Sequence, residues 1–109
     1  MPTTKLATPI ASYIAAANTQ DVEAVTACFD EAAVVQDEGQ SRQGITAIRA
    51  WAEEVSKNYR PTVDIIDVVE ENGKTIVMGR VSGNFPGSPI DLRYVFSLDG
   101  DKIARLEIS

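Results

Sequence analysis

Asp37 is the residue whose type and position point most directly to chemistry, because it stands at the end of a short apolar stretch, residues 32–36. A carboxylate there is either a proton acceptor beside a pocket or a turn residue that binds local backbone amides, which Asp does readily. The chain contains no histidine, which excludes histidine-based general bases, Ser-His-Asp and Cys-His nucleophiles and nearly all zinc sites. Any acid–base chemistry must therefore come from carboxylates, tyrosine or lysine.

The charge of the chain argues against several classes of partner. The formal net charge is −6, and the 10 basic residues are scattered, whereas a phosphate backbone requires clustered Lys and Arg. No apolar run reaches the roughly 20 residues of a membrane span, and the opening residues, MPTTKLATP, lack the apolar core of a signal peptide. We therefore expect no nucleic-acid partner and no membrane partner.

The single thiol and the dispersed acids set the expectations about compartment and cofactors. Cys28 cannot form a disulfide within the chain, which suits a reducing cytoplasm. Beside Phe29 in a predicted helix, it is interpreted as a small buried apolar residue. The acidic pairs at 30–31, 53–54 and 70–71 have no calcium-loop spacing and indicate solvated surface. We predict a cytoplasmic protein with no metal site and no cofactor.

Apolar residues at helical spacing predict three helices in the first half of the chain. Thr8 and Pro9 suit the cap and first turn of the first helix, and Asp21 is a good N-cap for a second, short helix. The third helix follows Gly44 and carries Trp51 at the edge of its apolar stripe.

Strand patterns precede the third helix and dominate after Pro61. A short strand is expected at residues 32–36, and Asn72-Gly73 is a strong hairpin signal. Gly79 and Gly83 suggest a bend or bulge, as a strongly curved sheet requires. The four strands of the second half are expected at residues 62–71, 74–85, 90–98 and 102–109.

The order helix, helix, strand, helix and four strands predicts an α+β protein, with one domain over residues 1–109. We expect a cone-shaped α+β barrel in which three helices pack on one face of a strongly curved antiparallel sheet. Such a sheet, closed by helices, tends to enclose a cavity suited to a small apolar ligand.

Two stretches of the chain carry a family resemblance: YIAAANTQDVEAVTACFDEAAVVQDEGQSRQGITAIRAW and GNFPGSPIDLRYVFSLDGDKIARLEI. Together they resemble the nuclear transport factor 2-like superfamily, in its ketosteroid isomerase and SnoaL-like branch. Their marks are a Tyr in the first helix, an N-x-x-D break, a Phe ending the second helix, an apolar strand ending in Asp and an AIR helix with an aromatic residue. The resemblance covers about residues 6–108 and is more specific for the fold than for an activity, because this fold hosts many functions.

The resemblance to ketosteroid isomerase implies catalytic roles for two residues. Asp37 falls at the position of the general base, which moves a proton between carbons beside a ketone. Tyr13 falls at the position of the phenol that donates a hydrogen bond to the developing enolate oxygen. Proton abstraction beside a carbonyl needs both functions, although Tyr13 lies on an apolar stripe and equally suits a core position.

The sequence departs from the family pattern at the second oxyanion donor. That position is nearest Leu92, and Asp91 is one residue away, so Asp91 is expected on the opposite face of its strand unless a bulge near Pro89 shifts the register. Dehydratase-like members rely on histidine, which is absent. The epoxide hydrolase branch places an Arg between carboxylates, whereas Arg80 is followed by Ser82 where an acid is wanted.

Three functions remain open: a cofactor-free isomerase or lyase acting beside a carbonyl, a non-catalytic pocket protein for a small hydrophobic molecule, and an association module. Asp91 and Arg93 share one strand face, and the resemblance implies a homodimer through the sheet. Aromatic and large apolar residues line the expected pocket or form plain core: Trp51, Tyr59, Met78, Phe85, Leu92, Tyr94 and Phe96.

Overall fold

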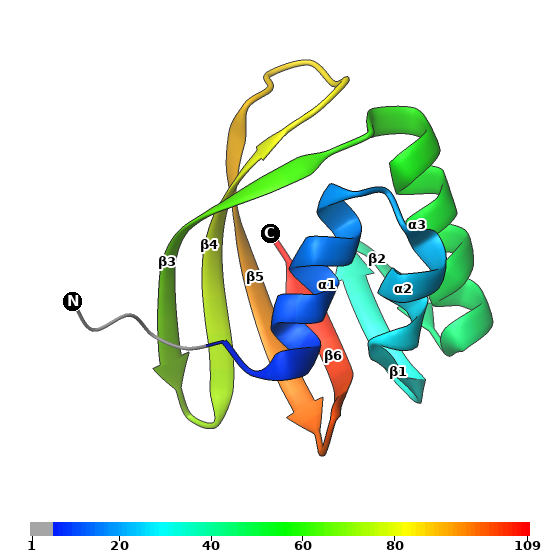
Figure 1. Cartoon of the computed structure of the whole chain (residues 1–109), viewed down its shortest axis with the longest axis vertical. Coiled ribbons are helices and arrows are strands. Elements are labelled where there is room, and N and C mark those ends of the chain that lie inside the picture. The colour runs from blue at the N-terminus through cyan, green and yellow to red at the C-terminus, as the bar shows by residue number, and fades with distance from the viewer. Residues whose placement is uncertain (1–5) are drawn as a thin grey trace.

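Three helices lie against one face of a six-stranded sheet (Figure 1). The computed structural model describes residues 6–109. The helices are α1 (Thr8–Asn18), α2 (Val22–Ala27) and α3 (Ile45–Tyr59). The strands are β1 (Phe29–Asp37), β2 (Gln40–Gln43), β3 (Thr62–Glu71), β4 (Lys74–Ser82), β5 (Ile90–Asp99) and β6 (Lys102–Ile108). The α+β class and the packing of the helices on one sheet face are as predicted.

The sheet order is β2-β1-β6-β5-β4-β3, and the sheet is not closed. Strands β3 to β6 form the predicted antiparallel meander. Two features differ from the expectation. β1 pairs in parallel with β6, with Val35 opposite Leu106, so the sheet is mixed. β2 is a strand that was not predicted: residues 40–43 pair with β1 through their backbone. These residues are polar and show no apolar alternation, so the sequence pattern gave no sign of a strand.

One irregularity of the sheet lies where β3 and β4 pair. A bulge lies on β3 between Ile65 and Asp67, opposite Gly79. A Cβ at Gly79 would lie 2.7 Å from Val63 Cγ1 and 3.3 Å from Tyr94 Cε1. The predicted bulge is therefore present, but on the neighbouring strand, and the glycine serves the close approach of side chains.

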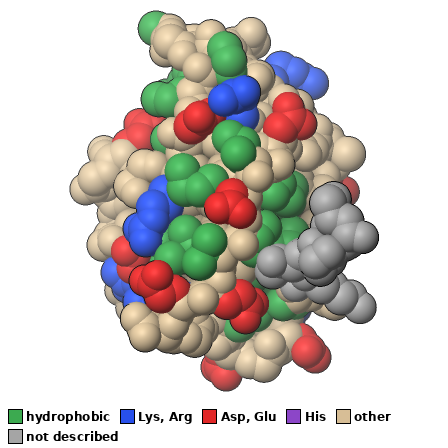
Figure 2. Space-filling view, turned by 90° about the vertical axis from the view of Figure 1, so that its left-hand side faces the viewer, with side chains coloured by type: hydrophobic (Ala, Val, Ile, Leu, Met, Phe, Trp, Pro, Cys, Tyr) green, Lys and Arg blue, Asp and Glu red, His purple; other side chains and the backbone are tan. Residues whose placement is uncertain are grey.

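Strand β3 forms one edge of the sheet and exposes apolar side chains. Figure 2 shows this side of the molecule, with apolar side chains lying among acidic and basic ones. Ile65, Ile66 and Val69 of β3 are all exposed; Asp64 precedes them in the sequence, and Asp67 lies between Ile66 and Val69. Charges on an exposed edge oppose pairing with another strand.

The core lies between the helices and the inner face of the sheet. Its fully buried side chains are Ile10, Val35, Ile48, Val77, Phe96, Ile103 and Leu106. Burial of such a side chain stabilises the fold by about 1.5–3 kcal/mol. In the described part of the chain, no helix has the length and apolar character needed to cross a membrane.

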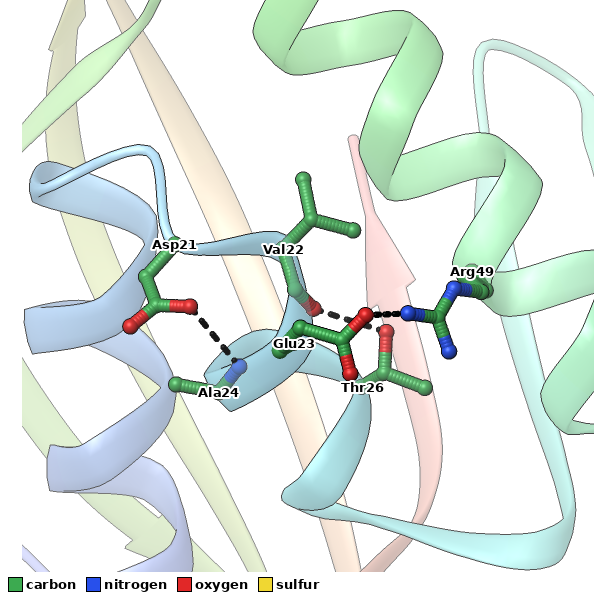
Figure 3. A network of polar contacts seen from close by, with 6 residues as sticks. All are labelled: Asp21, Val22, Glu23, Ala24, Thr26 and Arg49. Carbon is green, nitrogen blue, oxygen red and sulfur yellow. Dashed lines mark hydrogen bonds and ion pairs between the residues drawn. The ribbon is translucent and has the colours of Figure 1, made fainter.

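Local polar groups fix the helix ends. Thr8 is the first residue of α1 and not its cap; the N-cap position is Ala7, and the Pro follows in the first turn. Asp21 caps α2 as predicted, because its Oδ1 accepts a hydrogen bond from the Ala24 amide at 3.1 Å (Figure 3). Glu23 of α2 forms an ion pair with Arg49 of α3, which joins the two helices (Figure 3).

The Asn18 side chain attaches the end of α1 to the start of β3. Its Nδ2 donates to the Val63 carbonyl at 3.1 Å, and its Oδ1 accepts from the Val63 amide at 2.6 Å. The amide group thus satisfies both backbone groups of one residue, as a neighbouring strand would. This contact fixes the end of α1 over the sheet at Val63, which lines a cavity.

Candidate functional site

A cavity of about 550 Å³ lies between the helices and the inner face of the sheet. Most of its wall is apolar, and the residues come from all three helices, from the β1–β2 turn and from β3, β4 and β5. Its polar side chains belong to Tyr13, Gln20, Asp37, Glu38, Trp51, Ser56, Tyr59, Tyr94 and Ser109. An apolar cavity with a few convergent polar groups is the usual form of a small-molecule site.

Asp37 is placed on this wall by a tight turn. It is the last residue of β1 and pairs with Gln40 of β2 across the turn residues Glu38 and Gly39. Both turn residues have positive φ, 54° and 74°, as a type I′ hairpin turn requires. The strand therefore ends abruptly, and the Asp37 side chain is left at the cavity.

Helix α3 holds the Asp37 carboxylate in place. The indole Nε1 of Trp51 donates a hydrogen bond to Asp37 Oδ2 at 3.0 Å. Among the described residues, this is the hydrogen bond that the Asp37 side chain makes, and no turn amide donates to it. Trp51 is only 4% exposed, so a buried side chain fixes one carboxylate oxygen, and the other oxygen has no hydrogen-bond partner within residues 6–109.

Tyr13 and Tyr94 bring two phenol hydroxyls to the same wall. Neither hydroxyl bonds to another described residue, and no fully buried side-chain polar atom in that part of the chain lacks a partner. Both oxygens are therefore accessible from the cavity. The rings pack on one shared residue: Phe96 meets Tyr13 edge-on, with centroids 5.7 Å apart, and stacks with Tyr94 at 6.3 Å.

The pKa values of the two phenols depend on burial and on the neighbouring charges. Burial raises the pKa of Tyr13 well above its usual value, and the neighbouring Tyr94 and Asp37 raise it further. Burial also raises the pKa of Tyr94, with a further contribution from Asp37. Desolvation and a nearby negative charge both oppose ionisation of a phenol. Both hydroxyls therefore stay protonated near neutral pH and can donate hydrogen bonds.

The charged groups on the wall are acidic. Asp37 and Glu38 line the cavity, and Lys and Arg are absent from the described residues that do so. Within residues 6–109, Asp, Glu and Cys side chains form no cluster of three that could hold a metal ion. The described wall residues thus offer two carboxylates and neutral donors to a ligand, and no positive charge.

Most of the residues expected around a pocket do line the cavity. Trp51, Tyr59, Phe85, Leu92 and Tyr94 lie on the wall, together with Asp37 and Tyr13.

Two expected wall residues, Met78 and Phe96, do not line the cavity. Phe96 lies behind the tyrosine rings and is 0% exposed. Met78 alternates with the buried Val77 and Gly79 on β4, so its side chain is on the other sheet face.

The register of β5 follows the expectation for its acid. Leu92 faces the cavity, whereas Asp91 lies on the outside, where Arg80 Nε donates to its Oδ1 at 2.9 Å. No bulge separates the β4–β5 partners over this stretch. Asp91 is therefore not a cavity acid.

Comparison with known families assigns the chain. Residues 10–106 match the family model described as the SnoaL-like domain. The chain belongs to the SnoaL-like family. No curated protein sequence matches it.

Solved structures agree with this assignment. A "putative polyketide cyclase" from Sinorhizobium meliloti shares 34% identity and a TM-score of 0.93, with 100% of both chains covered. A protein with a ketosteroid isomerase-like fold from Catenulispora acidiphila, in complex with trimethylamine, has 15% identity and a TM-score of 0.82 over 99% of this chain and 86% of that one. SalBIII, an epoxide hydrolase/cyclase-like enzyme of salinomycin pyran ring formation, has 21% identity and a TM-score of 0.81 over 92% and 85%. The last two show a shared fold only.

Two polar residues on the cavity wall of this SnoaL-like domain were not anticipated from its sequence. Gln20 and Ser56 line the cavity. Gln20 Nε2 donates to the Pro61 carbonyl at 2.8 Å, and Ser56 Oγ donates to Gln20 Oε1 at 2.9 Å. Gln20 has a φ of 60°, an uncommon conformation for a residue other than glycine. The N-x-x-D break indicated only that a helix ends nearby, so no sequence signal pointed to this pair.

Proposed function

We propose that this SnoaL-like domain binds a small, mainly apolar molecule with a carbonyl group and moves a proton beside that carbonyl without a cofactor. Asp37 acts as the base, and Tyr13 donates a hydrogen bond to the carbonyl oxygen. The observation that carries the proposal is a carboxylate and a protonated phenol on the wall of one apolar cavity.

The chemistry requires only these two functions. Asp37 takes a proton from the carbon next to the carbonyl, and the electron pair of that C–H bond forms the enolate, whose charge develops on oxygen. The Tyr13 hydroxyl faces that charge and stabilises it. Asp37 then returns the proton to the same carbon or to another. Because Trp51 occupies one carboxylate oxygen, the other oxygen is the one that accepts the proton.

The names of related structures support this class of chemistry. The Sinorhizobium meliloti protein, which is 34% identical, is described as a "putative polyketide cyclase". Closure of a carbon ring in a polyketone begins with removal of a proton next to a carbonyl, which is the step proposed for Asp37. The ligand of this chain is accordingly a ketone or ester with a flat or cyclic apolar body.

Exchange of protons for deuterium next to the carbonyl tests the proposal directly. A panel of cyclic ketones is incubated in D₂O with the wild type, Asp37→Asn and Asp101→Asn, and the loss of α-proton signal is followed by NMR. General base catalysis contributes about 10²–10⁴-fold, so Asp37→Asn should lose most of the enzyme-dependent rate. Asp101, an exposed acid outside the cavity, provides the matched control. An unchanged rate in Asp37→Asn would refute the role of Asp37 as base, and ligand-induced stabilisation that survives this substitution would favour a non-catalytic binding protein.

An association role for the sheet is a second candidate function, supported by the exposed Ile65, Ile66 and Val69. We propose a homodimer that buries the outer sheet face, the face that carries the Arg80–Asp91 ion pair. Sedimentation of the wild type and of Ile66→Lys tests it: a dimer that the substitution dissociates supports the interface, and a wild-type monomer at every concentration excludes it.

We also propose that the protein is cytoplasmic. Its cysteine, Cys28, is free and buried, which suits a reducing compartment.

A further inference from the structure

We propose that Tyr94 is a second hydrogen-bond donor to the ligand carbonyl, so that Tyr13 and Tyr94 together form a two-phenol oxyanion site opposite Asp37. This inference rests on the proposed function. It assigns a catalytic residue that the comparison with ketosteroid isomerase does not supply, since the strand position expected for the second donor holds Leu92.

The acid next to that position cannot serve as the donor. Asp91 lies on the outer sheet face and is paired with Arg80 at 2.9 Å. Leu92 lines the cavity but has no polar group. A second donor must therefore come from elsewhere on the wall, and Tyr94 is the next residue of β5 on the same face.

The Tyr94 hydroxyl lies at the cavity and is free to donate a hydrogen bond. It reaches the cavity without a hydrogen-bond partner among the described residues, as does the Tyr13 hydroxyl. Phe96 supports both rings, which limits their movement relative to each other. The missing side chain at Gly79 allows the Tyr94 ring to lie close to strand β4.

The surroundings keep both phenols in the donor form. Burial opposes their ionisation, and so does the carboxylate of Asp37. No Lys or Arg among the described wall residues offsets this effect. The site therefore favours a ligand that is neutral when it binds and that develops negative charge on oxygen only as Asp37 takes its proton. A ligand carboxylate would instead meet the like charge of Asp37.

A bound phenolate tests the two-donor site. After proton transfer, Asp37 is neutral and the ligand oxygen is negative; 4-nitrophenolate bound to Asp37→Asn reproduces both charges. Dissociation constants are measured from the absorbance of the probe in this background, with Tyr13→Phe, Tyr94→Phe and both substitutions added. Each substitution keeps the ring, so the fold is preserved, and the thermal unfolding midpoint verifies it. Ser97→Ala, which removes a hydroxyl from β5 at a position that does not line the cavity, is the matched control.

We expect Tyr94→Phe to weaken binding about tenfold, Tyr13→Phe by a similar factor and the pair by about a hundredfold or less, because a hydrogen bond to a charged group contributes on this scale. Ser97→Ala should leave binding unchanged. If Tyr94→Phe binds the probe as tightly as its parent while Tyr13→Phe does not, the second donor is refuted and the proposed function stands with Tyr13 alone. If the parent does not bind the probe, the two-phenol site is refuted, and the deuterium exchange assay still decides the role of Asp37.

Discussion

The hydrogen bond from Trp51 to Asp37 ties the proposed base to helix α3, and Trp51→Phe removes it while keeping an aromatic ring. The bond joins Nε1 to Oδ2 at 3.0 Å, and a hydrogen bond to a charged group contributes about 1.5–3 kcal/mol. Because Asp37 is half-buried, we expect the lower end of that range. The smaller ring leaves a void in a site that is 4% exposed, which adds about 1 kcal/mol. Urea unfolding should therefore show a total loss of stability of about 2.5 kcal/mol.

A double-mutant cycle separates the hydrogen bond from the packing. The free energies of unfolding of Trp51→Phe, Asp37→Ala and the double variant are compared with the wild type. The packing loss is common to both Trp51→Phe steps and cancels, so the coupling energy reports the bond, expected at about 1.5 kcal/mol. A coupling below about 0.3 kcal/mol, the range of additive sites, would show that the bond does not hold Asp37. The same Trp51→Phe variant should also slow α-proton exchange, because the carboxylate loses its fixed orientation.

Three further predictions concern the two tyrosines, Gly79 and Cys28. The raised pKa values of Tyr13 and Tyr94 mean that above about pH 10 the unfolded chain releases protons that the folded chain keeps; stability should fall as pH rises, by up to about 1.4 kcal/mol per pH unit for each tyrosine. Urea unfolding from about pH 9 to about pH 11 should show a shallower fall in either Phe variant. Gly79→Ala brings a methyl group within 2.7 Å of Val63 Cγ1 and should cost about 1–3 kcal/mol with altered near-UV circular dichroism; an unchanged melting point would contradict the close approach. Burial raises the pKa of the Cys28 thiol, so a disulfide reagent should modify it slowly until urea unfolds the protein.

Local signals predicted most of the elements. The Asn72-Gly73 hairpin is present, with φ of 54° and 76° at its two residues, because a type I′ turn has a nearly unique composition. Asp21 caps its helix because short polar side chains accept hydrogen bonds from the first turn. Such features depend on neighbours in the chain, so the sequence displays them.

Features set by distant partners were not predictable in the same way. Alternation along β5 places Tyr94 and Phe96 on one face of the sheet. Whether each side chain reaches the cavity depends on the residues packed against it, and of these two only Tyr94 does. β2 is polar and exists because β1 lies beside it. The bond between Trp51 and Asp37 depends on where α3 crosses the end of β1, and no periodicity in the sequence records that crossing.

The parallel pairing of β1 with β6 affects the order in which the parts of the site fold. Phe29 lies opposite Ile103, so this pairing closes a very long loop, whereas the hairpins of β3, β4 and β5 close short ones. Long-range pairs carry a larger entropic cost and form slowly. β1, which carries Asp37 at its end, is therefore expected to dock after the meander has formed. Partly folded molecules then hold the tyrosine of β5 without its carboxylate partner, and the proposed proton transfer becomes possible only once β1 has paired with β6.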